Sequence, residues 1–301
     1  MSLISFSRDK FIPSDEVSLN VRSNFLSVAR GYQVFTFFKT VNNGKPVFLE
    51  DHINRVFSNA NDMKMNISHS KEDIKSLVFE TLEKNDFTNS ECNVMIILAG
   101  TVPDDNSGLT SSSYVDLFII TSPIKVYPAS SYENGISLGL YEYERIDAEI
   151  KTPFTYYSGV KAQQMHVKNG EFDEVLYTSN GSILEGTTFS FFAIKDDVVL
   201  TPKADGRILG SVTRKNLIRI MQTHQIKSLE ESISTDDINN FSEAFIASAN
   251  RDLIPVVKID NIDISDGKVG STYHKLMSIY QKEVIKNLSL IHISEPTRLQ
   301  Q

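Results

Sequence analysis

Hydrophobic and polar positions in the first third of the chain alternate in the periods typical of strands and helices. Residues 33–41 are rich in Val, Phe and Thr, which favour a strand, and a turn at Asn42–Lys45 connects them to a returning strand. Two later segments carry apolar residues at helical spacing, and Ser70 is a suitable N-cap for the second. The predicted strands cover 33–41, 46–49, 94–98 and 114–121, and the predicted helices cover 50–63 and 70–84.

The remainder of the chain is richer in short strands. Residues 122–134 carry the prolines and serines typical of a linker. Several short strands with peripheral helices then predict a barrel-like core. The predicted strands cover 136–143, 174–178, 182–185, 189–194, 198–201, 244–248 and 254–259, and the helices cover 156–169, 213–224 and 273–285.

These elements predict an α/β (α+β) fold with two domains. The smaller N-terminal domain covers 1–121, the interdomain linker 122–134, and the larger C-terminal domain 135–287. Residues 288–301 follow a complete helix and look like a non-native tail.

Composition narrows the class of partner. A net charge of −8 argues against nucleic acid or an anionic membrane, both of which favour a basic face. Cys92 is the only cysteine, so no intrachain disulfide can form, and a reducing, cytoplasmic location is expected. The N-terminus lacks a signal-peptide core, and no apolar run is long enough to span a membrane. Six scattered histidines and one cysteine predict no metal site.

Four features could carry chemistry. Lys151 is expected where an apolar strand gives way to a loop, a usual place for an active lysine. Glu185 has apolar neighbours and should be partly buried, where a carboxylate requires a positive partner. Residues 211–213 begin a predicted helix, whose backbone amides would bind an anion. Arg55, on an earlier helix, could add a bidentate phosphate contact.

Each of these features also has a common, non-functional explanation. A lysine after a strand is usually solvated, and a glutamate such as Glu185 often pairs with a surface lysine. A hydroxyl residue at a helix start is usually a simple cap, and a helix arginine such as Arg55 is usually exposed. The order in which they occur is more specific than any one of them.

That order resembles one family. The motifs are Asp51-His52-Ile53-Asn54-Arg55, then Lys151, Leu184-Glu185-Gly186-Thr187, Leu200-Thr201-Pro202 and Leu209-Gly210-Ser211-Val212-Thr213-Arg214. They are similar to those of the class IV aminotransferases, the fold-type IV enzymes that use pyridoxal 5'-phosphate. The family includes branched-chain aminotransferases, D-amino-acid aminotransferases and aminodeoxychorismate lyases. The resemblance covers about residues 10 to 285 and implies a two-domain homodimer with its cofactor between the domains.

The resemblance also implies a role for each motif residue. Lys151 would form the Schiff base and shuttle the proton, and Glu185 would bind the pyridine nitrogen. Tyr156 would lie near the cofactor, and Leu209 would pack on the ring face. The residues that would surround the phosphate are Arg55, Ser211, Val212, Thr213, Ser248 and Ala249.

Several positions depart from the family pattern. Ser211 stands where glycine is usual, Ala249 where threonine or serine is common, and Ser190 in place of an asparagine. These changes imply weaker phosphate binding, with Ser248 or Asn250 compensating. Ala99 stands where the D-amino-acid enzymes would carry an arginine that binds the substrate carboxylate, which counts against D-specificity.

The resemblance implies an aminotransferase that moves an amino group between a branched-chain L-amino acid and a 2-oxo acid such as 2-oxoglutarate. The alternative within the family is an aminodeoxychorismate lyase, which forms 4-aminobenzoate and pyruvate. Thr36, where aminotransferases often have glutamate, and the segment Ser248 to Val256 favour the lyase slightly. A third alternative is a non-catalytic homologue that binds the cofactor, but the presence of both Lys151 and Glu185 argues against it.

Overall fold

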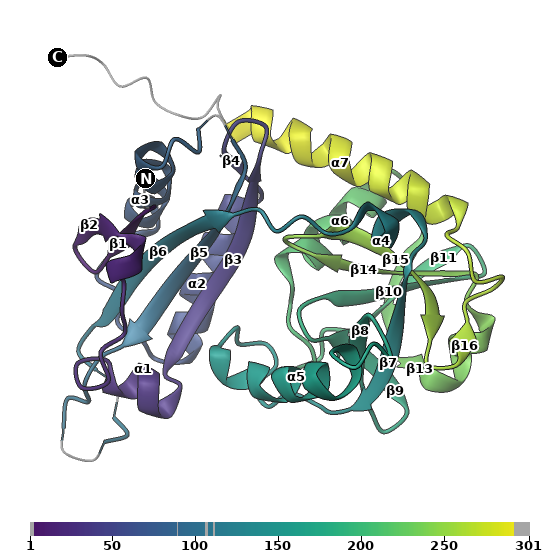
Figure 1. The fold of residues 1–301 in the computed structure, drawn as a ribbon, viewed down its shortest axis with the longest axis horizontal. Helices are drawn as coiled ribbons and strands as arrows, with labels where there is room; N and C mark the ends of the chain where they lie inside the picture. The colour runs from purple at the N-terminus through teal and green to yellow at the C-terminus, as the bar shows by residue number, and fades with distance from the viewer. Residues whose placement is uncertain (1–2, 89, 106–107, 111, 292–301) are drawn as a thin grey trace.

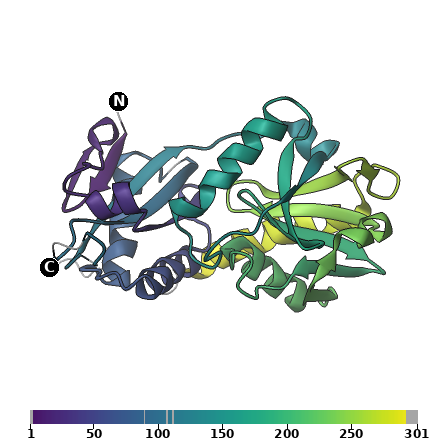
Figure 2. The same cartoon turned by 90° about the horizontal axis from the view of Figure 1, so that it is seen from below.

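Two β-sheet units lie side by side in the computed structural model (Figure 1). The structure describes residues 3–88, 90–105, 108–110 and 112–291, and residues 287–291 are described by their backbone alone. The first unit is built from the early part of the chain and the second from the later part. Helix α5 (Tyr157–Ala162) lies between them (Figures 1 and 2).

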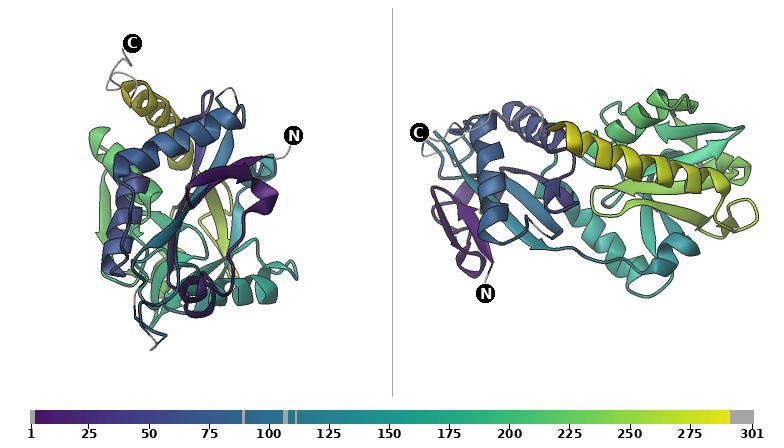
Figure 3. Two further views of the ribbon diagram at one scale, coloured as in Figure 1. Left: turned by 90° about the vertical axis from the view of Figure 1, so that its left-hand side faces the viewer. Right: turned by 90° about the horizontal axis from the view of Figure 1, so that it is seen from above.

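The first unit is a six-stranded sheet in the order β2-β1-β6-β5-β3-β4. Its longest strands are antiparallel neighbours, and side-chain burial in β3 alternates strictly, as expected when one face is buried. Helices α2 (Leu49–Asp62) and α3 (Lys71–Lys84) cover one face (Figure 3). The strands are β1 (Ile4–Ser7), β2 (Lys10–Pro13), β3 (Gln33–Val41), β4 (Lys45–Pro46), β5 (Cys92–Gly100) and β6 (Val115–Pro123).

The second unit contains a closed barrel. Strand β10 pairs with β14 and also with β9, so the path β10-β14-β15-β7-β8-β9 returns to its start. This closure confirms the barrel-like core. The strands are β7 (Ile136–Glu142), β8 (Glu174–Ser179), β9 (Ser182–Gly186), β10 (Ser190–Lys195), β11 (Val198–Pro202), β12 (Ser228–Glu231), β13 (Ile233–Ser234), β14 (Glu243–Ser248), β15 (Asp252–Ile259) and β16 (Ile262–Asp263).

Helices α6 (Val212–Thr223) and α7 (Ser271–Ile291) pack together on one side of the barrel. Two further short helices are α1 (Phe25–Arg30), before β3, and α4 (Ala129–Glu133), between the two sheets. Within the described ranges, no helix combines the length and the apolar character needed to cross a bilayer.

Most of the predicted elements occur within a few residues of their expected bounds. Strand β3 matches its prediction, and Ser70 caps α3 in a reciprocal capping box with Asp73. Several short elements had no prediction, because their hydrophobic patterns are too brief to show a period: β1, β2, β12, β13, β16, α1 and α4.

Three predictions were wrong in detail. The strand expected at 46–49 is only the two-residue β4, since Val47 and Phe48 pack into the core of the second unit instead. The helix expected at 156–169 is a 3₁₀ turn, the short α5 and a π-helical turn in succession. The strand before Lys151 ends at Glu142, so an eight-residue loop, 143–150, separates the two.

The division of the chain into domains remains our proposal. The first sheet ends at Pro123 and the second begins at Ile136, with α4 between them. The predicted linker at 122–134 is therefore partly regular structure. Helix α7 continues to Ile291, past residue 288 where the tail was expected to begin, and residues 292–301 lie outside the described part of the chain.

Candidate active site

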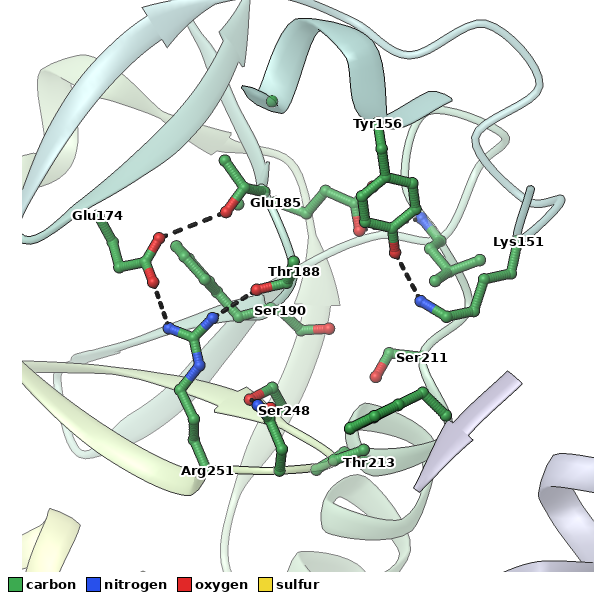
Figure 4. A pocket seen from close by; sticks show the side chains of 18 of the residues that line it. Lys151, Tyr156, Glu174, Glu185, Thr188, Ser190, Ser211, Thr213, Ser248 and Arg251 are labelled. Atoms are coloured by element: carbon green, nitrogen blue, oxygen red, sulfur yellow. Dashed lines mark hydrogen bonds and ion pairs between the residues drawn. The ribbon is translucent and has the colours of Figure 1, made fainter. Parts of the chain in front are cut away.

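One cavity of about 560 Å³ lies where the two sheet units meet. The first unit contributes Phe35, Phe37, His52 and Arg55 to its walls. The segment between the sheets contributes Lys125 and Tyr127, and the second unit contributes the rest. Figure 4 shows Lys151 and Tyr156 on one side and Glu174 and Arg251 on the other. All ten residues predicted from the sequence line it: Arg55, Lys151, Tyr156, Glu185, Leu209, Ser211, Val212, Thr213, Ser248 and Ala249.

Lys151 carries the amine of the site. Its Nζ donates a hydrogen bond of 2.7 Å to the hydroxyl of Tyr156. Burial lowers the pKa of Lys151, and the nearby guanidinium of Arg55 lowers it further against the opposing effect of Tyr156. Burial alone would raise the pKa of Tyr156, but Lys151 and Arg145 bring it below its usual value. A larger share of the Lys151 amine is therefore uncharged and nucleophilic at neutral pH.

The backbone of Lys151 is held by the first unit, although the residue belongs to the second half of the chain. Its N–H donates to Asn59 Oδ1 of α2 at 3.0 Å. Its carbonyl accepts from the N–H of Phe35 in β3, also at 3.0 Å. Asn59 also donates to the carbonyl of Glu149. These contacts fix the loop that presents the lysine to the cavity.

Glu185 is the buried carboxylate of the site. Its Oε2 accepts a 3.1 Å hydrogen bond from the N–H of Leu209, and its Oε1 lies 3.5 Å from Arg145 Nε. Burial raises the pKa of Glu185, although Arg145 and the Leu209 amide oppose this shift. Among the described residues, Oε1 has no hydrogen-bond partner. Oε1 is therefore engaged only through its charge, by the ion pair with Arg145.

Arg55 is the cation contributed by the first unit. One of its terminal nitrogens donates to Thr36 Oγ1 at 2.6 Å, and that oxygen also shares a 2.7 Å hydrogen bond with Nδ1 of His52. Burial lowers the pKa of Arg55 to about 10. No carboxylate of the described chain lies within ion-pair distance of it. A largely enclosed cation without a carboxylate partner is suited to bind an anion.

The N-terminus of α6 faces the same space. Ser211 caps the helix by accepting a hydrogen bond from the N–H of Arg214, and Val212 and Thr213 begin it. Figure 4 places the side chains of Ser211, Thr213 and Ser248 along one wall. The first amides of a twelve-residue helix have no partner inside the helix, and its dipole favours negative charge there.

Ser248 is the last residue of β14, and its hydroxyl donates to Asn250 Oδ1 at 3.1 Å. The amide of Asn250 donates in turn to the hydroxyl of Tyr127. Ala249 lines the cavity between them and brings no side-chain donor. Whether Ser248 and Asn250 compensate for Ala249 remains a prediction.

The wall opposite Lys151 is polar. Arg251 Nη1 forms an ion pair of 2.6 Å with Glu174, and its other terminal nitrogen donates to Thr188. Gln163 donates to the second oxygen of Glu174 at 2.7 Å. The charges of Arg251 and Glu174 therefore compensate each other.

The site fits pyridoxal phosphate, the cofactor that the motif order implies. Arg55 and the α6 N-terminus could bind a phosphate. The Glu185 carboxylate, which lines the cavity, could bind a protonated ring nitrogen, and the Lys151 amine could bind an aldehyde. In the described ranges, no cluster of three or more His, Cys, Asp or Glu could hold a metal ion.

Sequence reasoning missed Arg145 and Asn59. Arg145 is 6% exposed, lies over the rings of Tyr156 and Tyr177, and donates to two backbone carbonyls beside Glu185. An arginine and an asparagine in irregular or helical segments carry no motif of their own. Only their position beside Glu185 and Lys151 shows their importance.

Comparisons with known proteins agree with this chemistry. The family model for amino-transferase class IV matches residues 33–259. The chain is 26% identical over 244 residues to a D-alanine aminotransferase of Staphylococcus haemolyticus, which covers 80% of this chain and 84% of the relative. It is 25% identical over 271 residues to a putative branched-chain-amino-acid aminotransferase of Methanocaldococcus jannaschii, with 89% and 91% covered.

Solved structures show the same fold. The branched-chain amino acid aminotransferase of Escherichia coli has a TM-score of 0.83 at 20% identity, covering 92% of this chain and 93% of the other. That of Thermoproteus uzoniensis with norvaline has a TM-score of 0.83 at 21% identity, covering 95% of this chain and 96% of the other. A third, solved with pyridoxamine 5'-phosphate, has a TM-score of 0.85 at 20% identity, covering 94% of both chains. The chain therefore belongs to the class IV aminotransferases, enzymes that depend on pyridoxal phosphate.

Proposed function

We propose that this aminotransferase acts on branched-chain L-amino acids, with a 2-oxo acid such as 2-oxoglutarate as acceptor. The observation that carries the proposal is the cavity in which Lys151, Glu185, Arg55 and the α6 N-terminus converge. The same cavity is also lined by apolar side chains that suit an aliphatic substrate: Phe35, Phe37, Val160 and Phe189. A cytoplasmic location, which we inferred from the single cysteine, is part of the proposal.

We propose the following roles for the residues. The cofactor, when bound, withdraws electrons from the substrate α-carbon and so acidifies its proton. Lys151 Nζ would hold the cofactor covalently, and the same amine, once free, would accept the proton from the substrate α-carbon. Tyr156 keeps the amine in place through its hydrogen bond. Glu185, aligned by Arg145 and Leu209, holds a proton on the ring nitrogen.

Two other substrate assignments remain to be separated by experiment. Several curated relatives are named D-alanine aminotransferase. Against D-specificity, Ala99 brings no guanidinium and lies fully buried in β5. The lyase alternative draws on Thr36, but the hydroxyl of Thr36 is engaged by Arg55 and His52 within the core.

Adding single amino acids to the purified holoenzyme would separate these assignments. We expect L-leucine, L-isoleucine or L-valine to convert the visible absorbance of the lysine-bound cofactor to that of its amine form, and 2-oxoglutarate to restore it. Conversion by D-alanine and not by the L-amino acids would replace the proposed substrate class. Failure of all amino acids, with pyruvate released from aminodeoxychorismate, would establish the lyase.

Arg55→Ala is expected to weaken cofactor retention by about tenfold or more, since hydrogen bonds to a charged group contribute about 1.5–3 kcal/mol. Equilibrium dialysis of the holoenzyme would measure the loss. Arg22→Ala, which removes an exposed arginine of the first unit, is the control. Equal cofactor affinity in Arg55→Ala and the unaltered protein would contradict the phosphate role.

We also propose a homodimer. Apolar side chains are exposed along α5 and the turn before it, at Phe154 (63%), Tyr157 (75%) and Val160 (61%). Contiguous apolar surface beside a cavity is typical of an interface. Analytical ultracentrifugation should give twice the chain mass, and Tyr157→Glu should shift it toward the monomer. A monomer at micromolar concentration would contradict this expectation.

A further inference from the structure

One stripe of helix α2 touches three parts of the site. Asp51, Arg55 and Asn59 follow each other at four-residue spacing, which places them on one face of a helix. Arg55 reaches the cavity itself. The other two residues contact backbone and side chains of the second unit, one at each end of the cofactor site.

Asp51 binds the helix that begins the phosphate site. Its Oδ2 accepts a hydrogen bond of 2.8 Å from Asn216 Nδ2, and its Oδ1 pairs with Lys215 at 2.7 Å. Asn216 is 1% exposed and also donates to the carbonyl of Val212, the first residue of α6. Lys215 is 68% exposed, so its ion pair contributes little. The partly buried Asp51–Asn216 contact therefore fixes α2 against the first turns of α6.

The start of α2 is anchored at the same place. Phe48, which precedes the helix, has a backbone φ of +51° and packs with Val47 in the core formed by α6 and α7. A bulky side chain rarely adopts a positive φ, so the surrounding core must hold it there. Apolar packing thus sets the position of the α2 N-terminus, and Asp51 sets its direction relative to α6.

Asn59 binds the lysine loop at the other end. Its Oδ1 accepts from the N–H of Lys151, and its Nδ2 donates to the carbonyl of Glu149. Asn59 is 5% exposed, and these hydrogen bonds lie on either side of Ile150. The side chain therefore fixes the backbone from which the Lys151 amine extends.

We propose that Asp51 and Asn59 are positioning residues. Together they fix the distance between the groups that bind the phosphate end of the cofactor and the lysine that binds its aldehyde end. The two residues lie eight positions apart along the helix, a rise of about 12 Å. Asp51 sets the distance between Arg55 and the α6 N-terminus, so it acts on phosphate binding. Asn59 sets the approach of Lys151 Nζ, so it acts on covalent capture of the aldehyde, in which the carbonyl oxygen leaves as water. This inference rests on the phosphate site of the proposed function.

Comparing pyridoxal phosphate with pyridoxal, which lacks the phosphate, separates the two roles. The holoenzyme is freed of cofactor and titrated with each compound to obtain its Kd. The rate at which the adduct on Lys151 forms is followed by trapping it with borohydride. Asp51→Ala should raise the Kd of pyridoxal phosphate about tenfold and leave that of pyridoxal within about twofold. Asn59→Ala should slow capture of both compounds about tenfold and leave the ratio of their affinities unchanged.

Matched controls lie on the same helix. Glu50→Ala removes an exposed carboxylate from the same first turn, and Asn61→Ala removes an exposed asparagine near the other end. Neither should change affinity or capture rate. If Asp51→Ala does not fold, Asp51→Asn should shift the affinity ratio in the same direction by a smaller factor.

An unchanged affinity ratio in the Asp51 variants overturns the role of Asp51, and an unchanged capture rate in Asn59→Ala overturns that of Asn59. If both variants lose affinity and capture rate equally for pyridoxal phosphate and pyridoxal, and their Tm falls, the two residues have a merely structural role. Arg55→Ala tells which proposal has failed. If Arg55→Ala also leaves the affinity ratio unchanged, the phosphate site of the proposed function is wrong. If Arg55→Ala changes the ratio, the phosphate site stands and only the positioning role of Asp51 and Asn59 has failed.

Discussion

Lys151→Ala is expected to lower transamination by about 10⁴-fold or more, while the protein still folds. The variant loses both the nucleophile and the group that moves the proton, and positioned proton transfer alone contributes about 10²–10⁴-fold. Lys151 Nζ is held by Tyr156 inside the cavity and has a lowered pKa, whereas Lys125, which also lines the cavity, is exposed. Turnover of a branched-chain amino acid with 2-oxoglutarate, and borohydride trapping followed by peptide mapping, measure the effect.

Lys161→Ala provides the control for this result. Lys161 is an exposed lysine on α5 and does not line the cavity, so its loss should leave turnover and trapping unchanged. Trapping of the cofactor on any other lysine, or substantial turnover by the Lys151 variant, would refute the assignment.

Glu185→Gln is expected to lower kcat by about 10²–10³-fold, the range found when one preorganised electrostatic contact is removed from an active site. Glutamine has nearly the same shape but cannot balance a protonated ring nitrogen. It also leaves Arg145 buried without its anionic partner, so the Tm should fall as well. Stopped-flow measurement of the half-reaction with L-leucine would separate the loss in chemistry from a loss in binding.

The control for this second result is Glu142→Gln at the exposed end of β7. Glu142 accepts hydrogen bonds from Thr178 and Asn180 outside the cavity, so the change should leave kcat unaltered. A kcat for Glu185→Gln within about twofold of the unaltered protein would contradict the role of Glu185 at the ring nitrogen.

The sequence alone predicts the parts of this site that depend on local pattern. Glu185 falls within a strand whose apolar neighbours show its burial, and Ser211 begins a helix that its own hydroxyl caps. The position of α2 follows from helical spacing, so the placement of Arg55 on a helix was also predictable. Their common cavity was expected only through the resemblance to a known family.

The contacts that assemble the site could not be predicted in this way. Asn59 and Lys151 are 92 residues apart, and no periodic pattern records which side chain meets which backbone across that distance. Arg145 lies in an irregular loop, where no hydrophobic alternation marks burial. The break of the helix near α5 into 3₁₀, α and π turns likewise depends on tertiary packing and not on helix propensity.

The packing of Phe48 against Tyr280 has a consequence for synthesis on the ribosome. Phe48 emerges well before α7, and part of the surface against which it packs belongs to α7. Strands of the first sheet can pair early, but α2 cannot take its final position until α7 has left the exit tunnel. The nascent chain should therefore remain unable to bind its cofactor until α7 has emerged.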